Sequence, residues 1–497
     1  MNVAQGRADL NLAHRTRDAI FWNAGIVSLI SVGQFCVMLV MVRLLNPEVY
    51  GQYGLLMAIM GFLYVFSAQN FVDYALQVRR EADVHYQDIF TASVGVNFVL
   101  FVIANLIALG ARTYPEYANV EAPLRWLSIG FLLQPGRAVR IAMLKRELDW
   151  KRIRLLHGIG ALVSSCICIP LAYGGAGIYA LIVPTFVVPI PFLYDIFFRC
   201  SWRPSWTWRF ERLRPALKFG ANRQFSGFIG AGRRLLETSM LVQAVGFANF
   251  GLYGRAIGLA ELLCNRLLAH AIETLYPSLT KIEPQSIRFR RVSGLALRMT
   301  AWFSVAVAVL VGQFATVIVT ILYGGKWIDV IPLVSWSAML AAGGAINFTL
   351  YKLLLAHEQK GHCVWIDISL IAGTILSLYF LLPAGLVRYM QGLLLTQVIL
   401  VVVAVTLLSS QGGLNISAIS RAFVPPLVGT FCACVVFTEV FSALFNGFPA
   451  VIVLALQLVL YVAIYVSTVR LLFPHSLREL VIYMPKQDFL RKVLVLQ

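Results

Sequence analysis

Long apolar runs recur along this chain, and they constrain its fold more than any other feature. About fourteen segments have few charges and some twenty residues each, which is the length that an α-helix needs to cross a bilayer. We therefore predict an all-α polytopic membrane protein with about 14 transmembrane helices. The predicted spans are 20–42, 53–76, 89–110, 124–144, 155–173, 177–198, 216–243, 252–276, 295–322, 330–355, 363–382, 386–408, 422–445 and 448–472.

The composition supports the same conclusion and excludes a soluble domain. Of the 497 residues, 59% are hydrophobic and 13% are charged, whereas soluble domains carry about 25% charged residues. The net charge of +18 does not indicate nucleic acid, because basic residues accumulate in cytoplasmic loops of membrane proteins. No small-residue cleavage pattern follows the run 20–42, so we expect it to remain as an anchor rather than to be removed as a signal peptide.

The distribution of Lys and Arg predicts the orientation in the membrane. With the N-terminus in the cytoplasm, 27 of these residues fall in cytoplasmic segments and 4 on the opposite side. We therefore predict a multi-pass membrane protein with both termini in the cytoplasm. The bias supports an even number of spans, and a chain with one pair of helices fewer remains an alternative.

A short internal repeat predicts the domain organisation. Tyr50–Gly54 reads YGQYG and Phe250–Gly254 reads FGLYG, 200 residues apart and both before an even-numbered span. Such a repeat in matching topology predicts two parallel-related halves around a central cavity. The loop 200–215 interleaves Trp with Arg and is predicted to lie at the membrane interface as the linker. The predicted divisions are an N-terminal six-helix half at 1–198, a cytoplasmic linker at 199–215, a C-terminal six-helix half at 216–410, and an appended helix pair with a cytoplasmic tail at 411–497.

Three short motifs resemble the polysaccharide flippase family, the Wzx-like members of the multidrug/oligosaccharidyl-lipid/polysaccharide exporter superfamily. They lie in the family's order, and with the span pattern they cover nearly the whole chain. The matching residues are Arg43-Leu-Leu-Asn-Pro-Glu-Val-Tyr-Gly-Gln-Tyr-Gly54, Phe250-Gly-Leu-Tyr-Gly-Arg-Ala256 continuing to Leu275-Tyr-Pro-Ser-Leu-Thr280, and Tyr323-Gly-Gly-Lys-Trp327 followed by Ile331-Pro-Leu-Val334.

The resemblance implies a function and its partners. It implies a transporter that moves an oligosaccharide on an undecaprenyl pyrophosphate carrier from the inner to the outer leaflet by alternating access. The expected partners are this lipid-linked substrate, membrane lipids, H⁺ or Na⁺ as a coupling ion, and the polymerase and chain-length machinery of surface polysaccharide assembly. The resemblance supplies no catalytic residue, so we expect no enzymatic activity, no cofactor and no nucleic-acid partner.

Charges within the apolar spans are the candidate functional residues. The spans 216–243 and 252–276, joined by a predicted short turn at Val245–Phe250, carry an unusual number of them. An unpaired charge at the bilayer centre costs roughly 3 kcal/mol or more, so these side chains should face a protein interior or a water-filled cavity. Arginine suits a pyrophosphate because its planar fork binds phosphate oxygens bidentately. The candidate substrate-binding residues are Arg137, Arg140, Arg223, Arg233, Arg234, Arg266 and Arg298.

Each of these arginines has a structural alternative. Glu237 lies four residues after Arg233 and three after Arg234, so it can neutralise one of them. Glu261 or Glu273 can neutralise Arg266 in the same way. The remaining possibility is snorkelling, in which a long side chain near the inner interface reaches the headgroups, and it applies to Arg140, Arg223 and Arg298.

Four titratable residues are candidate sites for a coupling ion. A buried carboxylate carries a proton or ligates Na⁺, and a histidine titrates near neutral pH. The candidates are Glu237, Glu261, His270 and Asp367. Asp73 and Glu273 lie near span ends and are predicted to be ordinary interfacial charges. No metal site is expected, because none of the eight cysteines has a metal-ligand spacing to a histidine.

Two other functions are alternatives to a flippase. A cation-coupled multidrug exporter of the same superfamily would hold acidic residues for cationic drugs, whereas the mid-membrane charges here are mainly basic. A membrane glycosyltransferase or polymerase would need a large outer loop, and the longest one here, Gly110–Pro123, is short and has one arginine.

Overall fold

The computed structural model describes residues 30–67, 74–76, 78, 85–207, 209–264, 272–273, 275–276, 279–444 and 450–481. Within these ranges the side chains of 210–213, 215–226, 360, 436–444, 450–455 and 480–481 are not described. All regular elements in the described ranges are helices, which confirms the all-α fold class. The chain forms two compact units, Met1–Val242 and Gln243–Gln497.

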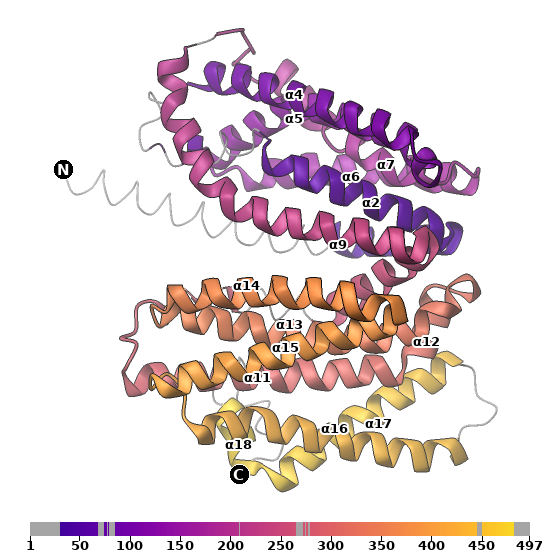
Figure 1. Ribbon diagram of the computed structural model, residues 1–497, viewed down its shortest axis with the longest axis vertical. Helices are drawn as coiled ribbons and strands as arrows, with labels where there is room; N and C mark the ends of the chain where they lie inside the picture. Colours follow the sequence, from indigo (N-terminus) through magenta and orange to yellow (C-terminus); the bar gives the residue numbers. More distant parts are fainter. Residues whose placement is uncertain are drawn as a thin grey trace. The chain divides into compact units, whose positions relative to one another are not determined.

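The first unit is a bundle built around α5 (Ala118–Arg146). This helix packs against α2, α4, α6, α7 and α8, and α4 runs beside it for much of its length (Figure 1). The other elements of the unit are the helix Ile30–Leu44, α2 (Pro47–Val65), α4 (Tyr86–Arg112), η2 (Pro115–Tyr117), α6 (Trp150–Tyr173), α7 (Ile178–Val187), α8 (Ile190–Tyr194), the π-helical turn η3 (Asp195–Arg199) and the first part of α9 (Phe210–Cys264).

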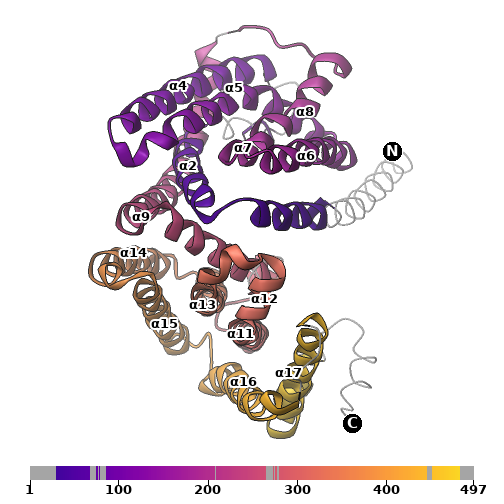
Figure 2. The same ribbon diagram turned by 90° about the vertical axis from the view of Figure 1, so that its right-hand side faces the viewer.

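The second unit has α11 (Ile287–Gln313) and α13 (Ile331–Ala356) at its centre. The share of the apolar segment that is buried is 56% for α11 and 50% for the segment that contains α13. It is 22–33% for the other long apolar helices of the described chain. In Figure 2, α11 lies between α13 and α16. The other elements are α12 (Ala315–Leu322), η4 (Gly325–Val330), α14 (Lys360–Leu376), η5 (Ser377–Leu381), η6 (Leu382–Ala384), α15 (Leu386–Ser410), α16 (Ile416–Leu444), α17 (Ala450–Leu472) and α18 (Pro474–Val481).

Small residues and interhelical hydrogen bonds hold these helices together. The hydroxyls of Thr300 on α11 and Thr349 on α13 are 3.0 Å apart and hydrogen-bonded. The Asn347 amide donates to the Gln397 carbonyl on α15 at 3.0 Å. A Cβ at Gly373 would collide with the Thr396 methyl, so α14 and α15 approach each other closely there. Lipid chains are as apolar as leucine, so membrane helices associate through this close packing and these polar contacts.

The structure supports most predicted spans and shifts one of them. Nine helices of the described chain are long and apolar enough to cross a membrane, with Ile30–Leu44 and Leu456–Leu472 as shorter apolar helices. The count of fourteen therefore stays a prediction. The second span was predicted at 53–76, but α2 begins at Pro47 and ends at Val65. Proline suits the first turn of a helix, because its fixed φ is helical and its missing N–H has no acceptor there.

The predicted turn at Val245–Phe250 is wrong in its extent. The backbone is helical through α9 except at Gly246, where φ is 76° and ψ is 169°. Glycine alone adopts this conformation without strain, so one residue replaces the expected loop. Gly246 lies 200 residues after Asn46, where the chain breaks between Ile30–Leu44 and α2. The repeated YGQYG and FGLYG motifs therefore each occupy the first turns of helix after an equivalent break.

We predict that Gly246→Ala destabilises the protein by about 1–3 kcal/mol, because a Cβ is strained at this φ. The free energy of unfolding, measured by thermal or denaturant unfolding in detergent, reports the change. The matched control is Gly258→Ala, at a helical position of α9 where an added methyl group would meet open space. That variant should be neutral or more stable by up to about 1 kcal/mol. Equal stability of the two variants would contradict a strained backbone at Gly246.

Candidate functional site

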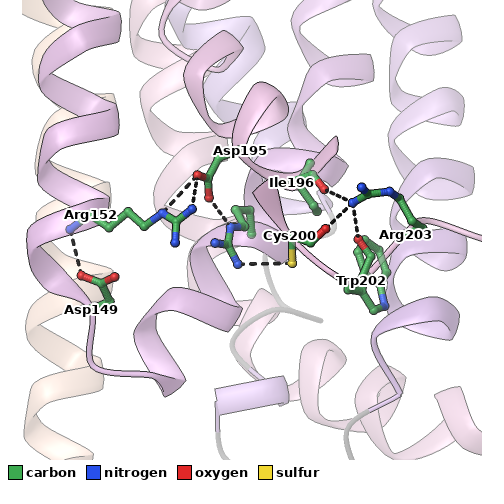
Figure 3. Close-up of polar contacts among 8 residues, drawn as sticks. Asp149, Arg152, Asp195, Ile196, Cys200, Trp202 and Arg203 are labelled. Atoms are coloured by element: carbon green, nitrogen blue, oxygen red, sulfur yellow. Dashed lines mark hydrogen bonds and ion pairs between the residues drawn. The ribbon is translucent and has the colours of Figure 1, made fainter. Parts of the chain in front are cut away.

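Arg140, a predicted substrate contact, is bound to a carboxylate inside the first unit. Its Nε donates to Oδ2 of Asp195 at 2.5 Å, and both side chains are almost fully buried. Arg152 donates to the other oxygen of the same carboxylate, with Nη2 at 2.6 Å and Nε at 3.1 Å (Figure 3). Two cations thus share one acid, which links α5, α6 and η3. Arg140 is thus paired internally and does not snorkel to the headgroups as its predicted alternative had it, and we leave it out of the proposed substrate contacts.

We predict that Asp195→Asn destabilises the protein by roughly 3–5 kcal/mol, because it leaves two guanidiniums facing each other without a counter-charge. The loss should appear as a lower unfolding midpoint in detergent. Glu121→Gln is the matched control, since Glu121 pairs with Arg125 of the same helix at 2.8 Å and the pair is partly exposed to solvent. A solvent-accessible pair contributes about 1 kcal/mol or less. Similar midpoints for both variants would contradict a structural role of Asp195.

Arg137 lies one turn before Arg140 but has a different environment. Its guanidinium lies over the Phe192 ring, 5.7 Å from the centroid. Its Nε is buried and has no hydrogen-bond acceptor, and none of the carboxylates in the described chain forms an ion pair with it. An aromatic face stabilises a cation without neutralising it. Arg137 therefore remains a half-buried positive charge able to bind an anion.

The arginines of α9 also include one that is paired with a carboxylate and one that has no described carboxylate partner. Arg233 donates to Glu237 at 3.3 Å, as its i,i+4 spacing predicted, and both side chains are partly buried. Arg234 is exposed on the next position of the helix, and the described residues include no carboxylate paired with it. Arg223 lies on α9 with an undescribed side chain, and Arg266 and His270 lie outside the described residues.

Arg298 is also paired, by a residue that the sequence did not single out. Its Nη1 donates to Glu479 of α18 at 2.7 Å, and Arg421 of α16 donates to the other oxygen of this carboxylate at 3.1 Å. Partial burial raises the pKa of Glu479, but the hydrogen bonds and charges of these arginines outweigh that effect and hold the pKa below its usual value. Leu477 packs near Trp302 of α11 and completes the attachment of α18.

We predict that Glu479→Gln loosens α18 and increases tryptic cleavage after Arg478 roughly fivefold, an effect of about 1 kcal/mol for a partly exposed pair. Because the pKa of Glu479 is lowered on folding, its contribution is present at neutral pH and is lost as the pH falls through that lowered value. Glu283→Gln is the control, because Glu283 is an exposed residue that precedes α11. Unchanged cleavage in Glu479→Gln would contradict the attachment.

The remaining coupling-ion candidates are exposed on their own helices. Glu261 is exposed on α9, and Asp367 on α14 accepts a hydrogen bond from the Tyr351 hydroxyl at 3.2 Å. Lys352 of α13 was not among the candidate functional residues predicted from the sequence. Its side chain is half-buried, with the ammonium 5.1 Å from the centroid of the Tyr276 ring and 5.2 Å from that of the Phe348 ring. A lone lysine inside an apolar run was the available signal. The described residues contain no metal-binding cluster of His, Cys, Asp and Glu.

The loop that contains Trp202 and Trp206 lies against the start of α4. The Gln87 side chain donates to the Arg203 carbonyl at 2.6 Å and accepts from the Ser205 N–H at 2.7 Å. Trp202 packs edge-on against Phe90, and Arg203 donates to the Cys200 carbonyl (Figure 3). Trp206 is 75% exposed, which suits a side chain at headgroup depth. The loop therefore has the features of an interfacial segment.

Comparison with known proteins assigns the family. A family model described as "Polysaccharide biosynthesis protein" matches residues 40–332, more than half of the chain. The chain belongs to this polysaccharide biosynthesis protein family. The match runs from the end of the helix Ile30–Leu44 into the start of α13, so it includes Arg137 and the described part of α9. The resemblance drawn from the sequence motifs is confirmed.

Individual relatives of this polysaccharide biosynthesis protein are distant. It is 21% identical over 317 residues to the succinoglycan biosynthesis transport protein ExoT of Rhizobium meliloti (strain 1021), and the match covers 62% of each chain. It is 17% identical over 450 residues to an uncharacterized membrane protein in the cps region of Klebsiella pneumoniae, covering 88% of this chain and 92% of that protein.

Solved structures share the fold. The lipid II flippase MurJ, in an inward closed conformation, aligns with a TM-score of 0.67 at 12% identity, covering 91% of this chain and 99% of the other. An inward-facing multidrug resistance transporter of the MATE family and the MOP superfamily aligns with a TM-score of 0.51 at 15% identity, covering 76% of this chain and 94% of that transporter. The chain therefore has the fold of MOP-superfamily transporters.

Proposed function

We propose that this chain moves a lipid-linked oligosaccharide from the inner to the outer leaflet of the bacterial inner membrane. The product would serve the biosynthesis of a surface polysaccharide such as an exopolysaccharide, a capsule or an O-antigen. The observation that carries the proposal is the family match over residues 40–332, in a chain with the fold of a lipid flippase. ExoT, a polysaccharide transport protein by name, adds support from a relative.

The charges in the helices favour an anionic substrate. An undecaprenyl pyrophosphate carrier presents at least two negative charges that cannot cross hydrocarbon alone. Arg137 and Arg234 are cations without a described carboxylate partner, and we propose that they contact the pyrophosphate together with Arg233, Arg223 and Arg266. Guanidiniums bind phosphate through charge-assisted hydrogen bonds, which replace the hydrogen bonds that the phosphate makes with water in solution.

The transport cycle we propose is alternating access, in which the substrate site opens first to one side of the membrane and then to the other. Coupling to H⁺ or Na⁺ would use Glu237, Glu261, His270 or Asp367. Glu237 has the clearest basis, since protonation of its carboxylate would release Arg233 from the 3.3 Å pair. The release would free a cation for the substrate at the same step.

A multidrug exporter of the same superfamily is the second candidate, because a MATE transporter shares the fold. Such an exporter would need acidic side chains for cationic drugs. The partly buried carboxylate Glu237 is already paired with Arg233, and Asp195 is enclosed by two arginines. The charge balance of the described helices therefore favours the anionic substrate.

We expect the purified chain in proteoliposomes to move a radiolabelled lipid-linked oligosaccharide between leaflets, and Arg137→Gln to lower the rate about tenfold or more. The loss corresponds to one charge-assisted hydrogen bond of roughly 1.5–3 kcal/mol. Because Arg137 has no carboxylate partner among the described residues, its neutralisation leaves no buried acid unpaired and should preserve folding.

Arg125→Gln, on the exposed side of the same helix, is the matched control and should transport at the wild-type rate. Unchanged transport in a folded Arg137→Gln variant would contradict its contact with substrate. Absence of flipping by the wild type, together with transport of a cationic drug, would favour the exporter.

A further inference from the structure

A basic pocket lies in the second unit, at the N-terminal ends of α11 and α16. Its volume is about 440 Å³, and α18 contributes Glu479 to its wall. Four guanidiniums line it, against this single carboxylate. They belong to Arg290, Arg291, Arg298 and Arg421. The pocket lies within one unit. Arg298 was a predicted substrate contact, but its pairing with Glu479 led us to leave it out of the proposed substrate contacts, so the two proposed sites share no arginine.

The two helices that line the pocket approach each other closely. A Cβ at Gly294 would lie 3.1 Å from the Ala418 methyl, and both residues line the pocket. Arg290, Arg291 and Arg298 follow Gly294's face of α11 at spacings of three to four residues. Arg421 lies one turn after Ala418 on α16. The sequence spacing therefore directs these side chains to one place.

The described residues do not balance the charge in the pocket. Glu479 pairs with Arg298 and Arg421, but among the described residues no carboxylate pairs with Arg290 or Arg291. The Nε atoms of Arg290 and Arg298 are buried without an acceptor, and the Arg298 side chain is only 6% exposed. Both helices also direct the positive ends of their dipoles toward the pocket, since α11 begins at Ile287 and α16 at Ile416. An anion would satisfy all of these groups.

Exposed apolar residues lie at the pocket, which favours a lipid over a free anion. Ile287 lines the pocket, and Ile416 lies between the lining residues Asn415 and Ser417. Ile287 is 83% exposed and Ile416 is 80% exposed, each at the first position of its helix. The basic residues around the start of α11 and Arg421 of α16 are predicted to face the cytoplasm, where anionic lipids attract arginines. Exposed isoleucines next to buried guanidiniums match a molecule with a charged head and acyl chains.

We propose that this pocket binds the phosphate-bearing headgroup of a resident anionic membrane lipid, with the acyl chains against Ile287 and Ile416. Arg290 and Arg298 contact the phosphate from α11, and Arg421 contacts it from α16. The bound lipid joins the starts of two transmembrane helices and neutralises the repulsion between their arginines. The proposal is independent of the substrate that the chain transports.

The test uses the full chain in phosphatidylcholine nanodiscs with a minor fraction of phosphatidylglycerol that carries a photoactivatable group beside its phosphate. Crosslinks to the peptides that contain residues 287–298 and 416–421 are quantified by mass spectrometry. Arg290→Gln/Arg421→Gln should reduce these crosslinks roughly fivefold for each arginine removed. Arg288→Gln is the control, because Arg288 is exposed on the same first turn of α11 and does not line the pocket.

The outcomes separate the sources of the phosphate. Preferential crosslinking that survives in Arg288→Gln and in Arg290→Lys/Arg421→Lys, and resists competing inorganic phosphate, supports the lipid site. Equal crosslinking in the wild type and the Gln variant would overturn it. So would an equal loss in Arg288→Gln, or full displacement by inorganic phosphate. If the double variant does not fold, Arg421→Gln alone gives the comparison, since that side chain is 46% exposed.

Discussion

The cost of placing a charge in an apolar helix is the constraint on which this structure depends. The spans carry arginines that hydrocarbon alone would not tolerate, so each needs a compensating group. Arg140 is compensated by a buried carboxylate and Arg298 by a carboxylate from the tail helix. Arg137 instead lies over an aromatic ring, which stabilises the cation and leaves its charge available.

These three solutions imply different roles for residues that look alike in the sequence. A buried ion pair fixes the helices that contribute to it, because removing one partner leaves an uncompensated charge. Asp195 joins α5, α6 and η3 in this way, and Glu479 joins α11, α16 and α18. Two cations without a described carboxylate partner are central to our ligand proposals, Arg137 for the substrate and Arg290 for a lipid headgroup. The proposed sites also include paired arginines, such as Arg233 and Arg298.

The two halves of the repeat use different residues to make an equivalent break. In the first half, Asn46 and Pro47 end one helix and begin the next. In the second half, Gly246 makes a single non-helical residue within α9. Tyr50 and Phe250 follow these breaks by the same distance, and both are buried. The shared motif therefore packs in a similar way in the two units, although the preceding backbone differs.

The sequence by itself determined the all-α membrane fold and the family, because apolar length and short ordered motifs are local properties of the chain. It also placed Glu237 within reach of Arg233 and Arg234, since all three lie on one helix, and the structure shows the pair with Arg233. Only the tertiary structure decided which distant carboxylate reaches which arginine. Asp195 lies 55 residues from Arg140, and Glu479 lies 181 residues from Arg298. Helical spacing carries no information over such separations, because packing between helices brings these partners together.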